Sequence, residues 1–243
     1  MILNKNKLLV YVIGILIAYT YGIFTAQYKV FPYHETRSIK RFFINDSNAK
    51  KINYTSRNLN YYLYKKSFFE EHVRKVAIVM LGDSITDHGE WQDLFPSKTI
   101  TNQGISGDTT AGVLDRVDLI HKTEASKVFV MIGINDLSRG MSIVDVFENY
   151  QKIVNKLVKN NIKVYIQSTL LKGKKRSNIN KKVIALNNML ENIADTNELI
   201  TYIDLNEALS NGSYLREGYS YDDLHLNAKG FKVWKDIIRP YIM

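Results

Sequence analysis

The chain has 243 residues and no cysteine, which excludes a disulfide scaffold and a cysteine-ligated zinc site. Hydrophobic residues make up 45% and charged residues 23%, the composition of a folded protein with one sizeable domain and an appendage. The net charge of +9 arises in the first 75 residues, which hold 13 lysines and arginines against 4 acids, whereas the other 168 residues hold 20 of each sign. A nucleic-acid groove in the main domain therefore lacks electrostatic support, and we expect no nucleic-acid partner.

Residues 8–24 form an almost wholly apolar stretch, within 21 uncharged residues that separate Lys7 from Lys29. As a helix these 21 residues would span about 31 Å, close to the ~30 Å hydrocarbon core of a bilayer. The stretch predicts a single-pass membrane anchor within residues 1–28, and a cleaved signal peptide is the alternative. Lysines and arginines flank it on both sides, so the positive-inside rule does not settle the orientation. We expect the main domain on the extracytoplasmic side.

Residues 29–75 are basic and rich in asparagine, lysine and tyrosine. Apolar residues recur at helical spacing near the end of this segment, at Leu59, Tyr62, Leu63, Phe68 and Phe69. The spacing predicts a connector that ends in an amphipathic helix packed on the domain. RNA binding is a weaker interpretation, because no RNA-binding module is recognisable.

From residue 76 to residue 243, short β-branched runs alternate with longer helical patterns, which predicts parallel strands joined by crossover helices. The candidate strands are residues 76–81, 98–103, 127–133, 163–170 and 199–205. Helical patterns occupy residues 109–121, 142–160, 178–196 and 227–240, with expected core positions at Val144, Phe147, Ile153, Leu157, Val158, Phe231, Trp234 and Ile238. The predicted fold is a flavodoxin-like three-layer α/β/α sandwich with a five-stranded parallel sheet.

Polar motifs follow the first three candidate strands and precede the last helix: GDSITD (82–87), GISGDTT (104–110), GIND (133–136) and DDLHL (222–226). The carboxyl ends of parallel strands meet at one edge of a sheet, so we expect these loops to converge. A serine hydroxyl becomes nucleophilic when a base removes its proton, and His225 is the histidine with an aspartate three residues earlier on a short loop. Asp222 could then fix the imidazole tautomer, while we expect the Asp223 side chain to diverge. Each motif alone could be a turn or a helix cap.

Taken together, the four motifs resemble the SGNH hydrolases, also called GDSL esterases and lipases, over roughly residues 76–241. Ser84, Gly107, Asn135 and His225 match the four letters of that name, and the motifs look most like the branch of the platelet-activating-factor acetylhydrolase catalytic subunits and bacterial carbohydrate O-acetylesterases. The resemblance implies a catalytic triad of Ser84, His225 and Asp222. It also implies an oxyanion hole from the backbone N–H groups of Ser84 and Gly107 and the Asn135 side chain, and structural roles for Asp83 and Asp108. The sequence shows no metal-ligand cluster, and we expect no metal or cofactor.

We therefore expect an esterase that removes small acyl groups, acetyl above all, from a carbohydrate or similar substrate. A lipase or lysophospholipase, or an acyltransferase, could use the same residues. A non-enzymatic anchored binding module is the least favoured hypothesis, because the nucleophile, base and orienting carboxylate are all present.

Overall fold

The computed structural model describes residues 16, 18–21, 23, 59–194 and 197–243, and the chain divides into two compact units, Met1–Ile52 and Asn53–Met243. The predicted anchor at residues 8–24 lies mostly outside the described residues, as do its expected end at residue 28 and most of the 29–75 connector. Within the part of the chain that is described, no helix has both the length and the apolar character needed to cross a membrane.

The unit Asn53–Met243 is built on a parallel sheet of five strands in the order β2-β1-β3-β4-β5. The strands are β1 (Ile78–Gly82), β2 (Ile100–Gly104), β3 (Lys127–Met131), β4 (Lys163–Gln167) and β5 (Ile200–Ile203). Strands β3, β4 and β5 lie inside their predicted ranges, and β1 and β2 each extend one residue beyond the predicted carboxyl end. The predicted parallel sheet is confirmed. Gly82 at the end of β1 is in register with Gly104 of β2 and Met131 of β3, which brings the three following loops to the same edge.

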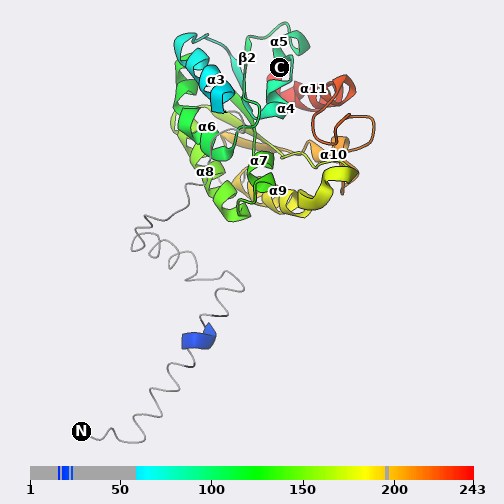
Figure 1. The fold of residues 1–243 in the computed structure, drawn as a ribbon. Helices are drawn as coiled ribbons and strands as arrows, with labels where there is room; N and C mark the ends of the chain where they lie inside the picture. Colours follow the sequence, from blue (N-terminus) through cyan, green and yellow to red (C-terminus); the bar gives the residue numbers. More distant parts are fainter. Residues whose placement is uncertain (1–15, 17, 22, 24–58, 195–196) are drawn as a thin grey trace, which may run out of the picture. The chain divides into compact units, whose positions relative to one another are not determined.

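Helices cover both faces of the sheet (Figure 1). One layer holds α6 (Thr110–Arg116), the 3₁₀ helix η1 (Val117–Thr123), α8 (Ile143–Lys159) and α9 (Asn180–Ala194); the other holds α4 (Ser84–Asp87), α5 (Trp91–Leu94) and α11 (Ala228–Ile242). The helices fall into two layers because the chain moves across the sheet in both directions, from β1 to β2 on one side and then from β2 to β3 on the other. Right-handed crossovers in opposite directions place their helices on opposite faces of the sheet. Shorter elements are α7 (Ile134–Ser138), η2 (Lys174–Ile179) and α10 (Asn206–Leu209).

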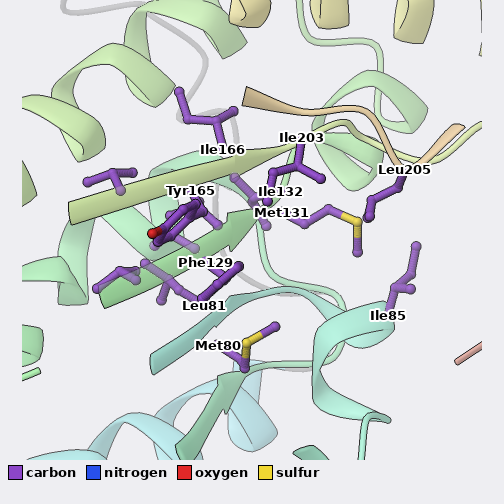
Figure 2. Close-up of a cluster of buried hydrophobic side chains, with 14 of the residues drawn as sticks. Met80, Leu81, Ile85, Phe129, Met131, Ile132, Tyr165, Ile166, Ile203 and Leu205 are labelled. Atoms are coloured by element: carbon purple, nitrogen blue, oxygen red, sulfur yellow. The ribbon is translucent and has the colours of Figure 1, made fainter. Parts of the chain in front are cut away.

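The central strands are buried on both sides, and Figure 2 shows their side chains filling the space above and below the sheet. Phe129 of β3 stacks on Tyr165 of β4 with ring centroids 4.5 Å apart. On the α11 side, Trp91 meets Trp234 edge to face at 4.7 Å. This aromatic and aliphatic packing holds the strands firmly and so fixes the edge from which the polar loops emerge.

Two helices differ from the expectation in detail. In α8, Ile153 and Leu157 are buried as predicted, but Val144 is not in the core, and Tyr150 is fully buried. Tyr150 is tolerated there because its hydroxyl donates to the Val130 carbonyl oxygen at 2.9 Å. Helix α11 runs to Ile242, beyond its predicted end at residue 240, since a proline in the last turn removes a single intrahelical hydrogen bond.

Helix α3 (Leu59–Glu71) packs beside α6 through a narrow face. Tyr62 and Phe69 are buried, and the Tyr62 hydroxyl donates to the Gly112 carbonyl oxygen at 3.0 Å and to Asp115 at 2.9 Å. The other three apolar positions expected on its packed face are exposed, at 45% for Leu59, 52% for Leu63 and 49% for Phe68. The helix is therefore present, but its apolar residues are spread around it and do not form one stripe.

Candidate active site

Ser84 is the first residue of α4 and is separated from the end of β1 by Asp83 alone. Asp83 caps this helix, because its carboxylate accepts the Ile85 N–H at 3.0 Å. The preceding Gly82 has no room for a side chain, since a Cβ there would lie 2.3 Å from the Met131 carbonyl oxygen. The turn from strand to helix is thereby tight, and it places the serine at the carboxyl edge of the sheet with 8% of its surface exposed.

The Ser84 hydroxyl meets the imidazole of His225, which lies far along the chain on the loop before α11. Ser84 Oγ and His225 Nε2 are 2.8 Å apart, and His225 Nδ1 is 2.8 Å from Asp222 Oδ2. This continuous chain of hydrogen bonds joins a potential nucleophile, a base and an orienting carboxylate, as a serine hydrolase requires. The structure thus brings together the three residues predicted as a triad.

The Asp222 carboxylate is held by its own loop. Its second oxygen, Oδ1, accepts the backbone N–H groups of His225 at 2.8 Å and Leu224 at 3.0 Å, and the Ser220 hydroxyl at 3.2 Å. Partial burial would raise the pKa of Asp222, but the hydrogen bonds and the His225 ring outweigh it and hold that pKa well below its usual range. Asp223 has a positive φ of 63° and lies against Gly173, so it diverges as expected.

The predicted oxyanion donors come from the loops after β1, β2 and β3. Asn135, in the first turn of α7, donates its side-chain amide to the Asp108 carbonyl oxygen at 2.9 Å, which fixes it beside the Gly107 turn. Gly107 has a φ of 80°, a conformation that favours glycine, and its carbonyl oxygen accepts from Arg139 at 2.8 Å. Within the described residues, no acceptor takes the backbone N–H of Ser84 or of Gly107. Both groups are available for a substrate oxygen.

Behind these loops lies a group of buried carboxylates that sequence reasoning left unconnected. Asp108 is fully buried and paired with Arg116, whose guanidinium donates to it at 2.9 Å and 3.1 Å. Asp136 accepts the N–H and hydroxyl of Thr110 at 3.1 Å and 2.6 Å, which ties α7 to α6. Burial raises the pKa of Asp136 to about 6 and that of Asp83 to about 7. No set of three or more histidine or acidic side chains in the described part of the chain is arranged to hold a metal ion.

His88 is a neighbour of the site that the sequence analysis did not single out. Its exposed ring lies against the His225 ring, with centroids 4.9 Å apart. The sequence held a signal for this neighbour, because His88 follows Ser84 by four positions, a spacing that places two residues about one helical turn apart. In the structure the His88 backbone N–H donates to the Ser84 carbonyl oxygen. The His88 ring limits the space in which the His225 imidazole can turn.

A cavity of about 490 Å³ opens near the edge strand β5, away from these residues. Polar and aromatic side chains line it, among them Asn188, Glu191, Tyr202, Asp204 and Arg216. Neither Ser84, Asn135 nor His225 contributes to its wall. The cavity is therefore separate from the candidate active site.

With this geometry established, comparison with known proteins identifies the family. Residues 80–233 match the model of the GDSL-like lipase/acylhydrolase family. The chain belongs to this family. It is a carboxylic ester hydrolase of the GDSL type, so the resemblance seen in the four motifs is confirmed.

Curated proteins and solved structures are also similar to this hydrolase. The N-acylneuraminate cytidylyltransferase of Streptococcus agalactiae serotype V is 26% identical over 166 residues, which cover 68% of this chain and 38% of the relative, so the hydrolase spans well under half of that protein. A GDSL-like lipase from Bacteroides thetaiotaomicron superposes with a TM-score of 0.65 at 22% identity, over 74% of this chain and 96% of that one. The acetyl xylan esterase AlAXEase gives 0.59 at 21% identity, over 68% and 99%. Both structures share the fold.

Proposed function

We propose that this GDSL hydrolase removes small acyl groups, acetyl above all, from the hydroxyl groups of a carbohydrate through an acyl-enzyme on Ser84. The observation that carries the proposal is the pair of 2.8 Å hydrogen bonds linking Ser84 to His225 and His225 to Asp222. A serine that is hydrogen-bonded to an oriented imidazole is the arrangement that makes a hydroxyl nucleophilic at neutral pH.

In the proposed reaction Ser84 Oγ attacks the ester carbonyl carbon while His225 Nε2 takes the hydroxyl proton. The tetrahedral intermediate then collapses, the bond to the sugar oxygen breaks, and His225 returns the proton to the leaving alcohol. A water molecule repeats the attack on the acyl-enzyme, which releases the carboxylic acid and restores Ser84. Asp222, ionised because its pKa is low, stabilises the imidazolium that forms in each half of the cycle.

Negative charge develops on the carbonyl oxygen during this attack. We propose that the N–H groups of Ser84 and Gly107 and the side-chain amide of Asn135 stabilise it. The N–H groups of Ser84 and Gly107 have no acceptor among the described residues. The hydrogen bond from the Asn135 amide to the Asp108 carbonyl oxygen fixes the orientation of that amide. Donors that are fixed before the reaction stabilise the oxyanion without reorganisation, and each is worth about 10²- to 10³-fold in rate.

The preference for a small acyl group on a sugar has two supports. Two connections at the active edge are short, with one residue between β1 and α4 and two between β3 and α7, which leaves these two loops too short to form a lid over a long acyl chain. Among similar proteins, one is named an acetyl xylan esterase, a name that refers to acetyl esters of a carbohydrate.

The test is a chain-length series of p-nitrophenyl esters together with acetylated xylooligosaccharides, each assayed with the wild type and with Ser84→Ala. We expect the highest kcat/KM for the acetyl ester, release of acetate from the oligosaccharide, and loss of both activities in the variant. An optimum at long acyl chains would replace this proposal with a lipase. Acyl transfer to an added sugar in preference to water would replace it with an acyltransferase.

We also propose that residues 8–24 anchor the hydrolase to a membrane with its active domain on the extracytoplasmic side. The support is the length and apolar character of this stretch in the sequence. Fractionation of cells that produce the full chain and a chain without residues 1–28 tests it. We expect activity with the membranes for the full chain, and activity in the soluble fraction for both would refute the anchor.

A further inference from the structure

The loop after β4 carries four cations within five residues, Lys172, Lys174, Lys175 and Arg176. It emerges at the same edge of the sheet as Ser84, because β4 is parallel to β3 and β1. The hydrolytic steps described above use none of these side chains. Two of them, Lys172 and Arg176, contact the loops that form the active site.

The Lys172 ammonium lies next to the helix that carries Asn135. Its Nζ donates to the Ser138 hydroxyl of α7 at 2.9 Å, in a hydrogen bond that is open to solvent. Ser138 follows Asn135 by three positions, so the two side chains share one face of α7 with about 5–6 Å between their Cβ atoms. The ammonium is therefore about one helical turn from a proposed oxyanion donor, and a ligand can reach it.

The backbone of this loop is fixed, which gives the Lys172 side chain a defined origin. The buried Asn180 side chain accepts the Lys172 N–H at 3.0 Å and donates to the Lys172 carbonyl oxygen at 2.8 Å. Next to it, the Gly173 N–H donates to the Asp223 carbonyl oxygen at 2.8 Å, so closely that a Cβ on Gly173 would lie 2.0 Å from the Asp223 carboxylate. The basic loop is thus joined directly to the loop of Asp222 and His225.

The charges around Lys172 are unbalanced. The Arg176 guanidinium lies 4.0 Å from the Asp222 carboxylate, which is already bonded to His225. Burial, and after it the charge of Arg176, lowers the pKa of Lys172. Across the described residues, no carboxylate comes within 4.0 Å of the Lys172 ammonium. Two neighbouring cations that share no anion repel each other, and a negatively charged ligand beside them would relieve that repulsion.

We propose that Lys172 and Arg176 bind a negatively charged group, a carboxylate or a phosphate, on the sugar whose ester reacts at Ser84. This inference rests on the proposed function and narrows it, from carbohydrate esters in general to esters of acidic sugars. The ester carbonyl would lie at Ser84 and Asn135, and the acidic group would lie about one helical turn further, beside Ser138.

The test measures inhibition of p-nitrophenyl acetate hydrolysis by three sugars at constant ionic strength: methyl glucoside, methyl glucuronide and glucose 6-phosphate. We expect at least one of the two charged sugars to inhibit about 30-fold more strongly than the neutral one, as charge-assisted hydrogen bonds allow. The stronger of the two identifies the anion as carboxylate or phosphate. Lys172→Met should lower the charged-to-neutral selectivity about tenfold and Arg176→Gln about threefold, while Lys172→Arg should keep most of it.

Lys122 provides the matched control, because it is exposed on η1, before β3 and therefore toward the opposite edge of the sheet. Lys122→Met removes the same charge and should leave the selectivity unchanged. The measured quantity is a ratio, so a general loss of activity in a variant cancels. Equal inhibition by charged and neutral sugars, or a ratio unmoved by both Lys172→Met and Arg176→Gln, would overturn the inference. Selective inhibition without release of acetate from any acetylated sugar would instead refute the proposed carbohydrate substrate.

Discussion

Replacing Asp222 with asparagine tests the role of the orienting carboxylate without changing its size. In the wild type Oδ1 accepts from three donors, the N–H groups of His225 and Leu224 and the Ser220 hydroxyl, while Oδ2 accepts from the His225 ring. An asparagine that keeps its oxygen toward the loop donors presents its NH₂ group to His225 Nδ1. The ring must then carry its proton on Nε2, where it cannot accept the proton of Ser84.

The opposite orientation of the amide is unfavourable. It would turn the NH₂ group toward the N–H groups of His225 and Leu224 and lose both hydrogen bonds, at a cost of about 2–3 kcal/mol. The variant should therefore hold the wrong imidazole tautomer, for which a loss of about 10⁴-fold in kcat is typical, equivalent to about 5 kcal/mol in the activation free energy.

The assay for Asp222→Asn is steady-state hydrolysis of p-nitrophenyl acetate, with urea unfolding as a check on the fold. We expect an unfolding midpoint close to that of the wild type, because the oxygen that caps the loop is retained. A variant that keeps more than about a tenth of wild-type kcat would refute the reasoning. Tautomer control by Asp222 would then lower the activation free energy by less than about 1.4 kcal/mol.

Three further predictions follow from the neighbouring residues. Asn135→Ala should lower kcat about 10²- to 10³-fold with little change in KM, and near-normal kcat would rule Asn135 out as an oxyanion donor. Asp83→Asn should flatten the pH dependence of stability. The raised pKa of Asp83, about 7, means that the folded state keeps a proton that the unfolded state loses, so this group destabilises the fold increasingly as pH rises from about 4 to 7. Relative to the wild type, the variant should gain about 3 kcal/mol of unfolding free energy between about pH 5 and pH 8 in urea titrations, and parallel curves would contradict this. Arg116→Met should cost about 3–5 kcal/mol, because it leaves the Asp108 carboxylate buried without its cation; a loss below about 1 kcal/mol in urea unfolding would show that the pair is dispensable.

Much of the fold was predictable because most of the strands are short apolar runs that end in a polar turn. The same feature located Ser84 and Asn135, since parallel strands deliver their following loops to one edge whatever their separation in sequence, while His225 was located by the aspartate three residues before it. What the sequence could not supply were contacts that depend on how the loops pack. The position of Lys172 beside Ser138 is such a contact, because it joins segments far apart in the chain.

Arg116 illustrates a second limit. Its place in a helical pattern near other charged residues is typical of a solvent-exposed side chain, yet it is fully buried against Asp108. Helical periodicity predicts which side of a helix faces the sheet, but not that an ion pair is buried under a loop. The partly exposed apolar residues of α3 show the converse, because the spacing of Leu59, Leu63 and Phe68 suggested burial that the packing does not provide.

The most direct test of the account is to trap the covalent intermediate. Wild-type enzyme mixed with excess p-nitrophenyl acetate and quenched in acid within the first turnover should gain one acetyl group by intact mass, and peptide mapping should place it on Ser84. His225→Ala should show no such adduct on the same timescale. Acetylation of a different residue, or turnover by Ser84→Ala at the wild-type rate, would contradict the mechanism.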